Sequence, residues 1–153
     1  MKIELICIGD LKFKGLKEVE QEYIKRINFF TTFGIHTVKD VKSDEDAFKK
    51  KKEGQAMLEL LDTKDFVIAL DEHGKKMSSV QFSNIIAEKI QNHPHRIVFL
   101  EGGHAGLSEL LEDRIHLKIS FSEMTFSHDI FRVLFLEQLY RAFTIIKRIK
   151  YHR

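Results

Sequence analysis

The chain has 153 residues, a length typical of one domain. One proline and eight glycines exclude collagen-like, proline-rich and linker-like classes, and a single cysteine excludes an intrachain disulfide, which fits a reducing compartment. With 25 basic and 23 acidic residues the net charge is only +2, so any affinity for nucleic acid has to come from local patches.

The first half of the chain alternates short apolar runs with helical patterns. Residues 2–8 are rich in isoleucine and leucine and predict a strand. From residue 16 to residue 30 the apolar side chains recur at helical spacing. Residues 35–41 predict a weaker strand near an edge of the sheet, and residues 44–61 predict a charged helix.

The middle of the chain begins with a continuous apolar run at residues 66–70. Such runs are typical of strands covered on both faces, as in parallel sheets. Residues 71–77 predict a polar loop. Ser78 and Gln81 then match a capping box at the start of a helix, which Pro94 ends.

The same alternation continues to the end of the chain. The predicted elements are a strand at 96–100, a glycine-rich loop, a short helix at 108–113, a fifth strand at 115–120, a loop at 121–127 and a long helix at 129–148. Strands that alternate with helices indicate a single α/β domain over 1–153, with a mainly parallel sheet flanked by helices. Ligands of such sheets bind beyond the carboxyl ends of the strands, which points to loops 71–77, 101–107 and 120–128.

Two of these loops have an unusual composition. Glycines at 102, 103 and 106 would let a backbone approach a ligand closely, or would serve only a tight strand-to-helix turn. The spacing fits neither a dinucleotide fingerprint nor a Walker A motif. In the second loop, Phe121, Met124 and Phe126 could form an apolar slot with Ser122 and Thr125 as polar contacts, or could simply plug the core.

Three further features bear on function. The last helix is more apolar than one surface stripe requires, which indicates either a deep core position or, as we favour, a subunit interface. Residues 147–153 hold four basic side chains around Tyr151, which suits contact with phosphates and bases; a solvated terminus is the alternative. Histidines are scattered and Cys7 lies in a predicted buried strand, so no metal site is predicted.

No targeting or membrane-spanning segment is predicted. The apolar run at 3–8 is too short for a signal-peptide core, and no stretch approaches the ~20 apolar residues that cross a bilayer. We therefore expect a cytoplasmic protein with no membrane partner.

The sequence contains a series of motifs that extends over its whole length. They are residues 1–9, a Leu-Asp-x-x-Gly-Lys-x-x-Ser segment from Leu70, a Gly-Gly-x-x-Gly-Leu loop from Gly102, and a C-terminal signature at 121–126, 128, 132, 137, 140–142 and 151–153. Together they resemble the ribosomal RNA large subunit methyltransferase H family, of the SPOUT class. The sequence departs from the family pattern at Glu101, Ser127 and Lys150, where an apolar residue and two prolines are usual.

The resemblance implies a homodimer with a C-terminal trefoil knot and S-adenosylmethionine as methyl donor. It implies methylation of N3 of a pseudouridine in large-subunit ribosomal RNA, with the assembled ribosome as substrate. The cofactor-binding residues that it implies are Leu70, Gly102, Gly103, Gly106, Phe121, Ser122, Glu123, Met124, Thr125 and Phe126.

Catalytic roles follow from the same motifs and from residue type. His152 is a candidate base or proton shuttle for the imide N–H, and Tyr151 could stack on the target base. Arg132 and Arg141 could stabilise the developing imide anion or bind phosphate. The alternative is a non-catalytic protein that binds the ribosome and retains the fold.

Overall fold

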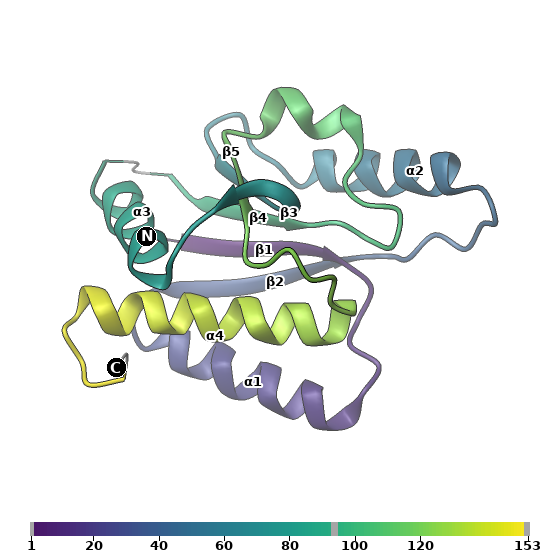
Figure 1. Cartoon of the computed structure of the whole chain (residues 1–153). Helices are drawn as coiled ribbons and strands as arrows, with labels where there is room; N and C mark the ends of the chain where they lie inside the picture. The colour runs from purple at the N-terminus through teal and green to yellow at the C-terminus, as the bar shows by residue number, and fades with distance from the viewer. Residues whose placement is uncertain (1, 93–94, 152–153) are drawn as a thin grey trace.

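A computed structural model of the chain describes residues 2–92 and 95–151. Within them lies one five-stranded sheet of order β2-β1-β4-β3-β5, in which every neighbouring pair is parallel (Figure 1). The strands are β1 (Lys2–Ile8), β2 (Thr32–Val38), β3 (Phe66–Lys76), β4 (Ile97–Glu101) and β5 (Leu117–Ser120). The helices are α1 (Lys14–Asn28), α2 (Asp46–Glu59), α3 (Ser79–Asn92), the short 3-10 helix η1 (Glu109–Arg114) and α4 (His128–Ile146). The predicted parallel α/β fold is therefore confirmed.

Alternation along the strands divides the core between the two faces of the sheet. Ile3, Leu5 and Cys7 point to one face, where they pack with buried residues of α1, α3 and α4. Ile6 and Ile8 point to the other face, which α2 and η1 cover. Burial raises the pKa of the Cys7 thiol, so this cysteine behaves as core rather than as a nucleophile.

The closing helix α4 lies deep in the monomer. Its buried apolar residues are Phe135, Leu136, Leu139, Ala142 and Phe143. They pack with α1 and α3 on one face of the sheet, which accounts for most of the apolar excess that we favoured as a subunit interface. Ile130, near the start of the helix, stays 47% exposed.

Strand β3 is longer than predicted, and the loop expected at 71–77 is wrong over most of its length. After Leu70 pairs with Ile119, the pairing shifts and Lys75 meets the same residue of β5. The chain crosses β5 at Gly74, where a Cβ atom would lie 2.6 Å from the backbone nitrogen of Ile119. The second half of β3 was not predicted because its side chains are polar. They are polar because this part of the strand lies at the edge of the sheet rather than in the core. The trefoil knot expected in this region stays a prediction.

Strand β2 also differs from its prediction. It lies at the edge of the sheet, as expected, but runs from Thr32 to Val38 rather than over 35–41. Asn28 explains the early start, because its side chain bonds both the nitrogen and the oxygen of Phe33, at 3.0 and 3.1 Å.

Side-chain contacts also order the start of α3. The predicted capping box is present: the Ser78 backbone N–H donates to Gln81 Oε1 at 2.8 Å, and the Gln81 N–H donates to Ser78 Oγ at 3.2 Å.

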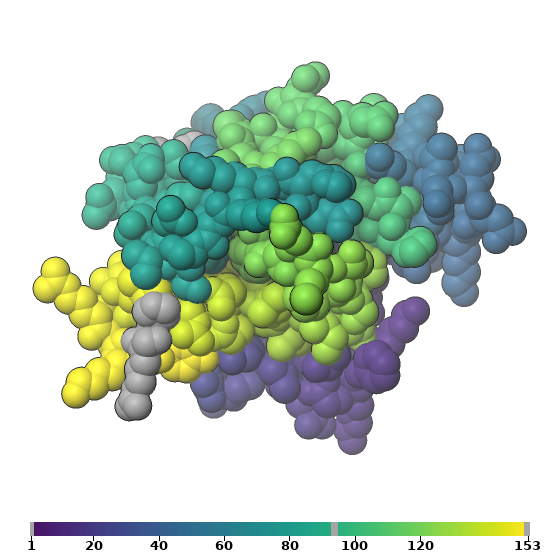
Figure 2. Space-filling model, in the orientation of Figure 1, coloured from purple at the N-terminus to yellow at the C-terminus, as the bar shows by residue number. Residues whose placement is uncertain are grey.

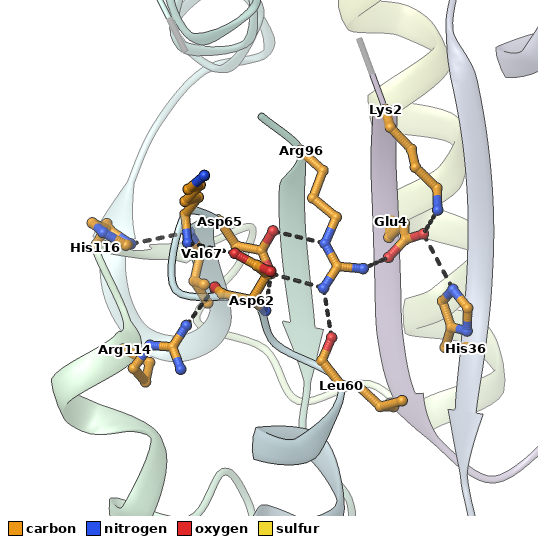
Figure 3. A network of polar contacts seen from close by, with 11 residues as sticks. Lys2, Glu4, His36, Leu60, Asp62, Asp65, Val67, Arg96, Arg114 and His116 are labelled. Carbon is orange, nitrogen blue, oxygen red and sulfur yellow. Dashed lines mark hydrogen bonds and ion pairs between the residues drawn. The ribbon is translucent and has the colours of Figure 1, made fainter. Parts of the chain in front are cut away.

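A charged network lies at the amino ends of the strands. Arg96 donates to Glu4 on β1, to both oxygens of Asp65 and to the carbonyl of Leu60 (Figure 3). Lys2 and His36 also lie against the Glu4 carboxylate, with His36 Nε2 at 3.2 Å. These contacts tie β1 to the segments that lead into β3 and β4.

Candidate functional site

The carboxyl ends of β3, β4 and β5 enclose a cavity of about 500 Å³. This volume falls in the range of ~300–1,000 Å³ that is typical of small-molecule sites. Its walls come from residues 70–73, 101–107 and 118–126, with Lys50 of α2 and the start of α4 at its margins. The three segments predicted from the sequence as ligand loops thus meet at one site. Figure 2 shows two of them, the teal end of β3 and the light-green residues after β5, side by side on one face.

The glycine-rich loop is a tight turn that closes on itself. Gly106 has a φ of +82°, and its N–H donates to the carbonyl of Gly103 at 2.9 Å. A Cβ atom on Gly102 would lie 2.7 Å from the carbonyl carbon of Gly106. Turn geometry therefore requires Gly102 and Gly106. The same turn exposes its backbone to the cavity, so both interpretations of these glycines apply together.

The segment after β5 divides its apolar side chains between core and cavity. The ring of Phe121 packs at 5.6 Å from that of Phe82 and at 5.8 Å from that of Phe131, so this residue plugs the core while it also borders the cavity. Met124 and Phe126 line the cavity and remain 75% and 37% exposed. Apolar side chains left in solvent at a cavity mouth favour a bound aromatic group.

Nine of the ten predicted cofactor residues line the cavity. They are Leu70, Gly102, Gly103, Gly106, Phe121, Ser122, Met124, Thr125 and Phe126. The tenth, Glu123, does not line it, because its carboxylate forms an exposed ion pair with Lys76 on β3. Ser122 holds the turn, since its Oγ accepts from the backbone N–H of Met124 at 2.9 Å.

Arg132 lies beneath the cavity rather than in it. Its side chain is 2% exposed, with Nη1 at 2.9 Å from the carbonyl of Gly9 and Nε at 3.3 Å from Oε2 of Glu101. In this position the guanidinium supports Glu101, which does line the cavity, and is not itself among the lining residues. Its predicted contact with an imide anion or phosphate stays a prediction.

The other predicted catalytic residues form a separate cluster at the far end of α4. Arg141 donates to Glu137 Oε1 with Nη2 at 2.7 Å, and its guanidinium carbon lies 4.9 Å from the centre of the Tyr151 ring. The Tyr151 hydroxyl donates to the same carboxylate at 3.1 Å, and burial raises its pKa, so it stays protonated. His152 lies outside the described residues.

Helix α4 separates this cluster from the cavity. His128, its first residue, lines the cavity, whereas Arg141 lies thirteen residues later, or about 20 Å along the axis at ~1.5 Å per residue. Figure 1 shows the two ends of α4 on opposite sides of the molecule, with the C-terminus at the far one. Within one protomer the tail and the cavity are therefore apart.

Sequence reasoning missed several cavity residues that come from other elements. Lys50 belongs to a lysine run that reads as a solvated helix face, and Glu112 and Lys118 pair with each other at 2.7 Å. His128 and Phe131 are set by the first turn of α4. Only the strand order brings Lys50, Glu112 and Lys118 to the cavity, whereas His128 falls at the end of the predicted ligand loop 120–128.

Comparison with known proteins places the chain in a family. The family model described as "Predicted SPOUT methyltransferase" matches residues 1–152. The ribosomal RNA large subunit methyltransferase H of Flavobacterium johnsoniae is 39% identical over 99% of both chains. The proteins of that name from Christiangramia forsetii and Clostridium botulinum are 41% and 40% identical, over 99% and 100% of both chains. The chain belongs to the SPOUT methyltransferases, in the family of ribosomal RNA large subunit methyltransferase H.

A solved SPOUT-class structure is also similar. The SpoU methyltransferase AviRb from Streptomyces viridochromogenes, in complex with AdoMet, aligns with a TM-score of 0.45 and 12% identity, over 97% of this chain and 58% of that chain.

The described residues hold neither a metal-binding cluster nor a helix that could span a membrane. Residues 2–92 and 95–151 of this SPOUT methyltransferase contain no group of three His, Cys, Asp or Glu side chains arranged to hold a metal ion. Over the same residues, no helix has the length and apolar character needed to cross a membrane.

Proposed function

We propose that the protein transfers a methyl group from S-adenosylmethionine to N3 of a pseudouridine in large-subunit ribosomal RNA, in the cytoplasm and on the assembled ribosome. The observation that carries this proposal is the cavity at the ends of three parallel strands, in a chain that matches full-length relatives named for methylation of that RNA.

The cavity fits the donor in size and chemistry. Its glycine loop offers backbone N–H and carbonyl groups, which can recognise an adenine edge without side chains. Phe126 and Met124 supply apolar surface for the ring, and the loop from Gly102 supplies the opposite wall.

The chemistry asks two things of the protein. The donor, when bound, supplies a methyl group on a sulfonium whose departure leaves a neutral thioether, so activation by a metal is not needed. The chain has to hold the RNA nitrogen in line with that methyl group and to accept the imide proton. We assign the proton to His152 and orientation of the base to Tyr151, with Arg141 near the phosphates.

The position of these residues supports a homodimer in which the tail acts in trans. Arg141 lies ten residues, or about 15 Å along the axis of α4, beyond Phe131, which lines the cavity, and Tyr151 packs on Arg141. A second copy that packs antiparallel would bring its tail to that cavity.

The enzyme is tested by donor binding and by its product. Titration calorimetry should detect S-adenosylmethionine binding to the wild-type protein and its loss in Gly102→Ala, since the added Cβ collides with Gly106. Large-subunit ribosomal RNA from cells without this protein should lack one methyl group on a pseudouridine, and mass spectrometry measures this. Donor binding with unchanged RNA would refute the substrate, and absence of binding would favour the non-catalytic alternative.

The ribosomal substrate is tested separately. A net charge of +2 gives little general attraction to RNA, so recognition by shape on a folded surface is favoured. Purified ribosomes should be methylated, whereas protein-free ribosomal RNA at the same salt should not. Equal rates on both would contradict this choice.

Action in trans is tested with mixed dimers. A heterodimer of one Gly102→Ala chain and one Tyr151→Ala chain, purified through two different tags, contains one complete site only if tail and cavity come from different chains. We expect about half the wild-type activity from the heterodimer and almost none from either parent homodimer. An inactive heterodimer would show that the tail acts in cis.

A further inference from the structure

The cavity carries more acid than base. Its lining contains four carboxylates, those of Asp71, Glu72, Glu101 and Glu112, and two ammonium groups, those of Lys50 and Lys118. With histidine neutral, this is an excess of two negative charges in a protein whose net charge is +2. Charge complementarity therefore favours a ligand with positive charge.

Glu101 is the buried member of this acidic set. It is the last residue of β4, on the face that packs against α4, and is 3% exposed. Its Oε2 accepts from Arg132, but its Oε1 has no hydrogen-bond donor. The nearest cationic candidate for Oε1 is Nδ1 of His128, at 3.6 Å, which forms an ion pair only when the imidazole is protonated.

Arg132 does not neutralise the site by itself. A second carboxylate, that of Glu20 on α1, approaches Nη1 of Arg132 to 4.0 Å, and its Oε2 also lacks a donor. One guanidinium thus serves one buried and one partly buried carboxylate. Glu20 does not line the cavity, whereas Glu101 does, so the uncompensated charge that a ligand would meet is that of Glu101.

We infer that Glu101 is a specificity-determining residue, which makes the cavity prefer the cationic methyl donor over the demethylated product. This inference rests on the proposed function. S-adenosylmethionine and S-adenosylhomocysteine share the adenosine, the ammonium and the carboxylate, and differ by one methyl group and the sulfonium charge. A carboxylate held in a buried wall acts on that charge, because screening by water is weak there. The preference would help the product to leave after each transfer.

The experiment measures both compounds on four proteins by titration calorimetry. The readout is the ratio of the product's Kd to the donor's Kd for the wild type, Glu101→Gln, Glu101→Asp and Glu20→Gln. In the wild type we expect the donor to bind more tightly. In Glu101→Gln, which keeps the shape and an acceptor for Arg132, the ratio should fall about tenfold, mainly through weaker donor binding. Glu101→Asp should recover most of the preference.

Glu20→Gln is the matched control, since it removes the other carboxylate beside Arg132 without changing the cavity wall. Its ratio should stay much closer to the wild-type value than that of Glu101→Gln, because Glu20 does not line the cavity. An equal loss of both compounds in Glu101→Gln, or an unchanged ratio, would overturn the inference and leave the proposed function intact. A wild-type protein that binds the product as tightly as the donor would also overturn it, even if Glu101→Gln failed to fold. A wild type that binds neither compound would refute the proposed donor, and the inference with it.

Discussion

The guanidinium of Arg96 donates two hydrogen bonds to the carboxylate of Asp65, from Nε to Oδ1 at 2.7 Å and from Nη2 to Oδ2 at 2.8 Å. The same guanidinium also donates to Glu4, whose side chain is 1% exposed. Arg96 thus connects β1 to the segments that precede β3 and β4. We expect this pair of hydrogen bonds to be the strongest polar contributor to stability at the amino ends of the strands.

Removal of Arg96 should therefore destabilise the fold. In Arg96→Ala the buried carboxylate of Asp65 loses its two hydrogen bonds and Glu4 keeps only Lys2 and His36, which costs about 3–5 kcal/mol. The shift in the urea midpoint measures this. The control is Arg26→Ala, which breaks an exposed pair with Glu22 and should leave the midpoint unchanged. Equal midpoints for Arg96→Ala and the wild type would contradict the role of this network.

The same network gives stability a dependence on acid. Burial by itself would raise the pKa of Glu4, but Lys2, His36 and Arg96 outweigh it and hold this pKa below its usual value of 4.5. A carboxyl with a lowered folded-state pKa stabilises the protein above the unfolded pKa and stops doing so as pH falls through the folded one. Stability should therefore fall below about pH 4.5.

Glu4→Gln isolates this contribution. The variant should be less stable than the wild type at pH 7, and the gap should shrink as the pH falls below 4.5. Urea titrations at pH values from 7 to 3 give the comparison. A gap that stays constant over this range would assign the stability difference to something other than the ionisation of Glu4.

The crossing of β3 over β5 depends on a glycine. In Gly74→Ala the added Cβ would lie 2.6 Å from the Ile119 backbone, so the strands must separate, at a cost of about 3 kcal/mol or more. Both thermal stability and donor binding should fall. Gly15→Ala is the control, because nothing lies within 4 Å of its Cβ position and helix α1 tolerates alanine. Normal stability in Gly74→Ala would contradict the close approach.

Phe126 should matter for ligand binding and little for folding. It lines the cavity but is 37% exposed, so Phe126→Ala should reduce donor affinity about tenfold, through lost stacking, with a small change in melting temperature. Phe29→Ala, which removes an aromatic ring that is 84% exposed outside the cavity lining, should change neither value. Calorimetry and thermal unfolding of the two variants decide this.

Local sequence patterns were enough to predict most of the fold. The apolar run at Phe66 and the capping box at Ser78 act over a few residues, so their signals survive without tertiary context. The second half of β3 was missed because its pairing partner, β5, lies more than forty residues away and its side chains are polar. The apolar pattern of α4 was compatible with core or interface, and only packing distinguishes them.

The site was predictable to the extent that it is built from loops. The rule that ligands bind at the carboxyl ends of parallel strands pointed to three segments that do border one cavity. Roles that depend on side-chain direction were not accessible in this way: the side chain of Glu123 points to Lys76, and that of Arg132 points to Glu101 and the carbonyl of Gly9. The distance between Tyr151 and the cavity follows from the length of α4 rather than from any motif.

The order of the strands along the chain also determines when, during synthesis, the protein can first form a complete cavity and bind a ligand. Residues up to 101 supply four of the five strands, but β5 and the segment after it are made later, and they form one wall of the cavity. A growing chain on the ribosome can therefore begin to build the sheet while it still lacks a complete pocket. Ligand capture becomes possible only near the end of translation, so the ligand can stabilise the finished protein but cannot guide the early steps of its folding.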